Sequence, residues 1–151
     1  MTAEPEKKKS GGKILACTIC CREKDRAEAA LPAIGRYRSG RIQTVFHMAE
    51  KEGLEFAILS GKFGLLHPED LIPYYDKLLT EEDIPALNRQ MAEFLRENPA
   101  RGIIFLPPDP RSDSKVMPYI KCMRRAARKA KIPLRIKFVP PYPERILAPG
   151  E

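Results

Sequence analysis

The sequence has 151 residues, of which 43% are apolar and 31% are charged, and its formal net charge is +7. This composition predicts one soluble domain that buries about two-thirds of its unfolded surface. No apolar run approaches the roughly 18 residues of a membrane span. The first twelve residues lack the apolar segment of a secretory signal, so we expect a cytoplasmic protein that does not enter a membrane. The positive charge favours anionic partners.

The two ends of the chain differ in composition from the middle. Residues 1–12 contain three consecutive lysines and two glycines and have little to bury, which predicts a disordered basic tail. Residues 140–151 contain four prolines and are expected to be extended. A single domain is therefore predicted over residues 13–139.

The first apolar run, residues 14–19, predicts a buried strand that ends in a polar loop. Cys17, Cys20 and Cys21 have a spacing that suits zinc or redox chemistry, but a second pair of ligands is missing. We therefore expect ordinary thiols, with Cys17 packed as a small apolar residue, and neither a metal nor a cofactor. Cys20 is the exception, because two basic side chains nearby favour its thiolate form and make it a candidate catalytic residue.

The pattern between residues 25 and 40 is weak. Residues 26–31 predict a short helical turn that a proline at position 32 ends. Tyr37 lies among three arginines, an arrangement that suits phosphate contact combined with base stacking, although a solvated loop is the competing interpretation. Ser39 is predicted to cap a helix over residues 41–52, whose apolar side chains recur at helical spacing. Tyr37 and Ser39 are both candidate phosphate- or ligand-binding residues.

A second buried strand, residues 56–59, runs into a loop rich in candidate ligand groups. Ser60, Gly61, Lys62 and Gly64 place a hydroxyl group, an ammonium group and two glycines at the end of the strand. Glycines there allow a sharp turn or the close approach of a ligand. This loop is predicted to bind phosphate, and the alternative for Lys62 is an ordinary surface lysine.

Two carboxylates follow this loop. Asp70 and Asp76 are candidate catalytic residues, since either could orient a substrate or act as a base. The alternative for Asp70 is that it starts a helical turn together with the two residues before it. Thr80 and Asp83 have the spacing of a capping box, which predicts a helix that continues to about residue 98.

The last third of the domain is strongly basic. A third buried strand over residues 102–106 is followed by a proline-rich loop, an amphipathic helix over residues 114–131 and an edge strand over residues 134–138. Between Arg111 and Lys137 there are ten basic residues and one acid. This excess is larger than solvation requires, so we predict contact with a polyanion. The nucleic-acid-binding candidates are Lys121, Arg124, Arg125, Arg128 and Lys129.

Residues 60–76 carry a family resemblance. Their sequence, SGKFGLLHPEDLIPYYD, resembles the signature of small prokaryotic proteins of uncharacterised function with Ser-x-Lys-(Tyr/Phe)-Gly-Leu and Pro-Tyr-Asp motifs. The same family has an upstream Cys-x-x-x-Lys, matched by Cys20 and Lys24, and a Tyr-x-Ser, matched by Tyr37 and Ser39. Tyr74 departs from the pattern, since it stands between the proline and the tyrosine of the last motif. The resemblance covers residues 14–79.

The resemblance implies functions that composition does not. The uncharacterised family implies no settled activity. The same stretch is similar, more loosely, to the YaaA peroxide-stress proteins, which implies DNA binding and protection against oxidative damage. A more distant similarity to the fold of uracil-DNA glycosylases implies chemistry on a glycosidic bond.

The order of elements predicts an α/β three-layer sandwich, in which a mostly parallel sheet of about four strands is flanked by helices. Right-handed crossovers then bring the loops that follow the strands to one edge of the sheet. Lys24, Ser60, Lys62 and the glycine N–H groups would meet there around a phosphate, with Asp70 or Asp76 nearby for proton transfer.

The functional hypothesis is a nucleic-acid-associated protein that binds nucleotide or DNA backbone phosphate and acts hydrolytically on a base or glycosidic bond. One alternative is a non-catalytic DNA-binding protein of stress protection. Another is a small-molecule nucleotide hydrolase or transferase. The sequence lacks both Gly-x-x-x-x-Gly-Lys-Ser and Gly-x-Gly-x-x-Gly, so ATPase and dinucleotide functions are not favoured.

Overall fold

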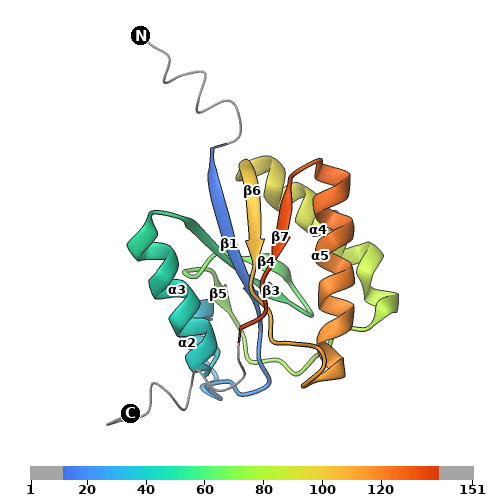
Figure 1. Ribbon diagram of the computed structural model, residues 1–151. Coiled ribbons are helices and arrows are strands. Elements are labelled where there is room, and N and C mark those ends of the chain that lie inside the picture. Colours follow the sequence, from blue (N-terminus) through green and yellow to red (C-terminus); the bar gives the residue numbers. More distant parts are fainter. Residues whose placement is uncertain (1–11, 140–151) are drawn as a thin grey trace.

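The computed structural model describes residues 12–139, so the predicted tails over residues 1–11 and 140–151 lie outside the described residues. A five-stranded sheet with the order β4-β3-β1-β6-β7 forms the centre of the molecule (Figure 1). All neighbouring strands are parallel except β4, which pairs antiparallel with β3. The strands are β1 (Lys13–Ile19), β3 (Glu55–Ser60), β4 (Gly64–Leu66), β6 (Ala100–Phe105) and β7 (Leu134–Ile136).

Helices cover both faces of this sheet, which confirms the predicted three-layer α/β fold (Figure 1). One face carries α2 (Ala33–Arg36) and α3 (Gly40–Glu52), and the other carries α4 (Ile84–Glu97) and α5 (Met117–Ala130). Short 3-10 turns, η1 (Glu81–Asp83) and η2 (Ser114–Val116), lead into α4 and α5. The central strands are buried on both sides, as their continuous apolar runs predict.

The helix starts follow the capping signals in the sequence. Ser39 Oγ accepts a hydrogen bond from the Ile42 backbone N–H at 3.3 Å, which confirms its predicted role as the N-cap of α3. The backbone N–H and the hydroxyl of Thr80 both donate to Asp83 Oδ2 at 2.9 Å. The predicted start of the helix that continues to about residue 98 is therefore confirmed, and the acidic residues at this start are structural.

The helical turn predicted over residues 26–31 is wrong. Leu31 and Pro32 form a short strand, β2, that pairs antiparallel with β5 (Leu71–Ile72), and α2 begins only after Pro32. The reason is Arg36, whose buried guanidinium binds four backbone carbonyl oxygens, two of them in the segment predicted to be helical. These acceptors belong to Asp25, Ala27, Ala29 and Ile72, at 2.6–3.0 Å. Carbonyls turned toward one side chain are not available to a helix.

Candidate functional site

The strand order changes direction at β1. The chain leaves β1 through α3 and returns in β3 on one side, whereas β6 joins β1 on the other side. The loops that follow β1 and β6 therefore diverge, and open α/β sheets bind ligands in the crevice at such a point. A cavity of about 520 Å³ lies there. We call it the switch-point cavity.

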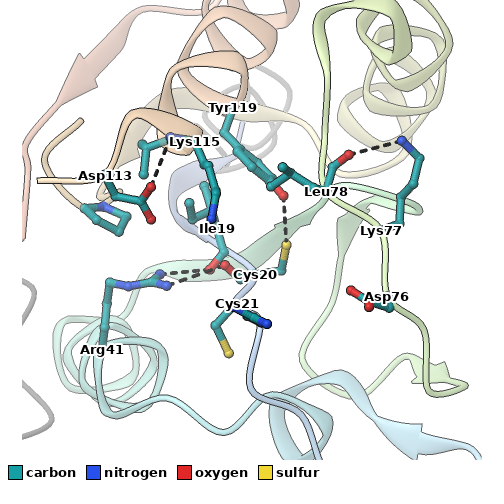
Figure 2. Close-up of a pocket in the computed structure, with 13 residues that line it drawn as sticks. Ile19, Cys20, Cys21, Arg41, Asp76, Lys77, Leu78, Asp113, Lys115 and Tyr119 are labelled. Atoms are coloured by element: carbon teal, nitrogen blue, oxygen red, sulfur yellow. Dashed lines mark hydrogen bonds between the residues drawn. The ribbon is translucent and has the colours of Figure 1, made fainter. Parts of the chain in front are cut away.

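Four parts of the chain line the switch-point cavity (Figure 2). They are the end of β1 with the residues after it (19–22), the first turn of α3 at Arg41, the segment 76–78, and the loop after β6 together with the start of α5. Two of the three predicted loops thus meet in one cavity. The third, residues 60–64, does not line it.

Positively charged side chains enter the cavity from separate elements. Arg22 and Lys115 are exposed, and their side chains make no hydrogen bond or ion pair within residues 12–139. Arg41 is buried, and its Nη1 donates to Thr18 Oγ1 at 2.7 Å and to the Ile19 carbonyl at 2.8 Å. These cations give one wall of the cavity a character that suits an anion.

Cys20 and Tyr119 meet in the middle of the cavity (Figure 2). The Cys20 thiol is 3.6 Å from the Tyr119 hydroxyl oxygen, which also accepts a hydrogen bond from the Leu79 N–H at 3.3 Å. Burial raises the pKa of the Tyr119 hydroxyl, so this group remains a neutral phenol at physiological pH. The ammonium group of Lys24, which was expected to favour the Cys20 thiolate, lies instead over the Tyr75 ring.

The other two thiols of the first loop differ in their surroundings. Cys17 is fully buried within β1, and burial raises its pKa, which confirms that it packs as a small apolar residue. Burial also raises the pKa of Cys21 to about 11, and its thiol donates to the Glu23 carbonyl at 3.0 Å. Both groups are therefore thiols rather than thiolates at neutral pH.

Ser60 and Tyr37, both predicted to contact phosphate, form hydrogen bonds inside the protein. Both are buried and hydrogen-bonded to the hydroxyl of Tyr75, at 2.8 Å from Ser60 Oγ and 2.5 Å from the Tyr37 hydroxyl. Ser60 Oγ also accepts from the backbone N–H groups of Lys62 and Phe63, each at 3.0 Å. The N–H groups expected to hold an anion are thus already used by the serine.

The glycines of this loop are required by the protein chain itself rather than by a ligand. A Cβ atom on Gly61 would lie 2.9 Å from the Leu79 nitrogen, the Lys77 carbonyl and the Tyr119 hydroxyl. Gly64 has a φ of 81° and lies against the side chain of Gln90. These contacts account for both glycines without a ligand.

Lys24 and Lys62 gather around neighbouring aromatic rings beside the cavity. Lys24 Nζ is 4.6 Å from the centre of the Tyr75 ring, and Lys62 Nζ is 5.6 Å from the centre of the Phe63 ring. The two rings pack edge to face at 5.2 Å. The two lysines thus share one cluster of rings, and neither of them lines the switch-point cavity.

The two candidate carboxylates have different positions. Asp70 Oδ2 accepts from the His67 backbone N–H at 2.9 Å and lies 3.5 Å from His67 Nδ1, so Asp70 stabilises a turn outside the cavity. Asp76 lines the cavity. Of the two carboxylates predicted to be catalytic, Asp76 therefore lies in the cavity and Asp70 lies outside it.

The basic residues of α5 form a surface separate from the cavity. Lys121 is paired with Glu81 at 2.5 Å and is only partly exposed. The remaining four candidates are exposed and have no ion pair within the described part of the chain. These four, named the α5 basic surface below, are Arg124, Arg125, Arg128 and Lys129.

Arg41 is one of the three arginines around Tyr37 that the sequence suggested for phosphate contact, but sequence reasoning did not identify two other residues of the cavity as ligands. Lys115 and Tyr119 lie at the start of the helix after β6. Each therefore stands near the amino end of a helix that follows a strand. This position was the available signal, because such helix starts meet at the binding edge of an open sheet.

The fold and the cavity define an α/β protein with a doubly wound, mostly parallel sheet and a polar cavity at its switch point. No family model, no curated protein and no solved structure matches this chain. Within residues 12–139, no group of three His, Cys, Asp or Glu side chains is placed to hold a metal ion. No helix in the same range is long and apolar enough to cross a lipid bilayer.

Proposed function

We propose that the protein binds the phosphate of a nucleotide, either free or within a nucleic-acid strand, in the switch-point cavity. The observation that carries this proposal is the pair Arg22 and Lys115. These cations come from loops after two different strands, face one cavity, and have no partner among residues 12–139. A phosphate between them would form charge-assisted hydrogen bonds, which are among the strongest available to a protein.

The size and the walls of the cavity support a ligand of this class. Its volume of about 520 Å³ lies in the usual range for small-molecule sites. Arg41 is held rigidly by Thr18 and the end of β1, so its guanidinium is oriented before any ligand arrives. Leu78 and the Tyr119 ring offer apolar surface on which a base could pack.

Hydrolysis of a glycosidic bond is the reaction we propose for this site. Asp76 and Cys20 are the two catalytic candidates that line the cavity. An aspartate carboxylate could orient water and stabilise positive charge on a sugar as the bond breaks. Binding of phosphate by the cations would hold the sugar in place for that step. A nucleotide hydrolase or transferase would use the same groups.

The binding proposal is tested by titrating wild-type protein with adenosine 5′-monophosphate and with inorganic phosphate in a calorimeter. We expect Arg22→Ala and Lys115→Ala each to weaken nucleotide binding by about tenfold or more, because each removes a charged hydrogen bond worth about 1.5–3 kcal/mol. Arg101→Ala is the matched control, since Arg101 is an exposed cation on β6 outside the cavity. Equal affinities in all four proteins would refute the proposal.

A second candidate function is non-catalytic binding of DNA by the α5 basic surface. The observation in its favour is that four cations of one helix are exposed together without an ion pair among the described residues. The resemblance to YaaA proteins agrees with this function. This surface does not line the switch-point cavity, so the two functions are separable by mutation. Neither function excludes the other.

A further inference from the structure

The backbone on both sides of Asp76 is anchored. The hydroxyl of Tyr75, the preceding residue, is bonded to Ser60 Oγ at 2.8 Å inside the core. The ammonium group of Lys77, the following residue, is 2.5 Å from Asp83 Oδ2 and donates to the Leu78 carbonyl at 3.1 Å. Asp76 is therefore held in place by its two neighbours rather than by contacts of its own.

The carboxylate of Asp76 has no hydrogen bond and no ion pair within residues 12–139, although it lines a cavity with several cations. Figure 2 shows why: Asp76 lies on one side of the cavity, Arg41 and Lys115 lie on the other, and Cys20 and Cys21 are between them. The cationic wall carries Arg41 and Lys115, together with Asp113, whose carboxylate accepts from the Lys115 backbone N–H (Figure 2). The opposite wall offers Asp76 as an unpaired acceptor beside Lys77, whose ammonium group is paired with Asp83 (Figure 2).

We infer that Asp76 binds the ribose hydroxyl groups of a ribonucleotide whose phosphate lies against the cationic wall. This inference rests on the proposed function and specifies its ligand. An ionised carboxylate only accepts hydrogen bonds, so it repels phosphate oxygens and attracts hydroxyl groups. Ribose carries two hydroxyl donors on adjacent carbons, which match the two oxygens of one carboxylate. Asp76 therefore selects ribonucleotides over sugars that lack these hydroxyls.

The test compares adenosine 5′-monophosphate with its 2′,3′-dideoxy counterpart by calorimetry, in the wild type and in Asp76→Ala. We expect the wild type to prefer the ribonucleotide by about tenfold or more, since hydrogen bonds to a charged group are at stake. Asp76→Ala should lose this preference by weakening ribonucleotide binding, while the dideoxy compound binds as before or slightly tighter. Glu69→Ala, which removes an exposed carboxylate outside the cavity, should keep the preference.

The possible results separate this inference from the function on which it rests. A wild type that binds both nucleotides equally through Arg22 would overturn the role of Asp76 and leave the phosphate site intact. A preference that survives in Asp76→Ala and in Asp76→Asn would do the same. If the wild type binds neither nucleotide nor inorganic phosphate, the proposed function and the inference are both wrong. Circular dichroism of each variant confirms that differences in affinity do not come from unfolding.

Discussion

The hydroxyl of Tyr75 lies 2.8 Å from Ser60 Oγ in the interior of the protein. This hydrogen bond joins the end of β3 to the segment that carries Asp76 into the switch-point cavity. Ser60 itself is held by two backbone N–H groups, so the segment is fastened to a rigid point at the edge of the sheet. The stability of the core and the geometry of the cavity are thus linked through one tyrosine.

We expect Tyr75→Phe to lower the free energy of unfolding by about 1–3 kcal/mol, because it removes the partner of buried hydroxyls on Ser60 and Tyr37. Tyr74→Phe is the matched control. Its side chain is at the surface, with the residue 37% exposed, and the change should stay within about 0.5 kcal/mol. Urea unfolding followed by circular dichroism measures both. Equal effects of the two substitutions would show that the buried network contributes no stability.

Arg36→Met is expected to be among the most destabilising substitutions. The guanidinium is fully buried and serves four carbonyl oxygens, which methionine would leave without a donor, at a cost of about 3 kcal/mol or more. Arg38→Met offers the comparison, since Arg38 is exposed and forms one ion pair with Asp25, worth less than about 1 kcal/mol. Thermal unfolding of both variants checks this, and a mild effect of Arg36→Met would contradict the assigned role.

Two glycine substitutions should have opposite effects. Gly64→Ala places a side chain at a φ of 81° and against Gln90, which should cost about 2 kcal/mol or more. Gly35→Ala adds a methyl group on α2 with no heavy atom within 4 Å, and should be neutral or stabilise the fold by up to about 1 kcal/mol. Chemical denaturation measures the difference. A Gly35→Ala variant that is less stable than Gly64→Ala would contradict the conformations assigned to these two glycines.

The pH dependence of thiol alkylation tests the surroundings of Cys21. Burial raises its pKa to about 11, so its thiolate fraction at pH 8 should be on the order of 100-fold below that of free cysteine. Iodoacetamide labelling, followed by mass spectrometry of the peptide, should therefore accelerate as the pH rises toward 11. A midpoint near 8.5 would mean that Cys21 is not desolvated. Because the raised pKa belongs to the folded state, its stabilising effect is complete below about pH 9 and is lost as the pH rises through 11.

The α5 basic surface predicts salt-dependent DNA binding. Combined replacement of Arg124, Arg125 and Arg128 by alanine should abolish binding to duplex DNA at moderate salt and reduce the slope of log affinity against log salt by about 2–3. Fluorescence anisotropy with a labelled duplex measures this. A control with three exposed cations changed elsewhere, at positions 26, 51 and 101, loses the same charge and should bind nearly as the wild type does. If both triple variants weaken equally, net charge rather than this surface is responsible.

The sequence predicted most of the fold and about half of the candidate site. Continuous apolar runs predicted the buried strands, and the capping residues Ser39 and Thr80 predicted where α3 and the helical segment that leads into α4 begin. The strand β4 was missed because it is only three residues long and begins with a glycine, which is typical of a loop. Asp76 and Cys20 were placed in the cavity correctly. Ser60 and Asp70 were not, because a hydroxyl or a carboxylate in a loop reads the same whether it caps a turn or faces a ligand.

The sequence by itself determined that this chain forms an α/β sandwich with a basic helix, because hydrophobic periodicity, caps and charge are local properties. Only the tertiary structure decided which polar groups already form hydrogen bonds within the protein. Arg36, Ser60 and Tyr37 look like surface ligands in the sequence, yet inside the protein Arg36 binds backbone carbonyls, and the hydroxyls of Ser60 and Tyr37 both bind the Tyr75 hydroxyl. Hydrogen bonds between distant segments fix that outcome, and they exist only after the chain has folded.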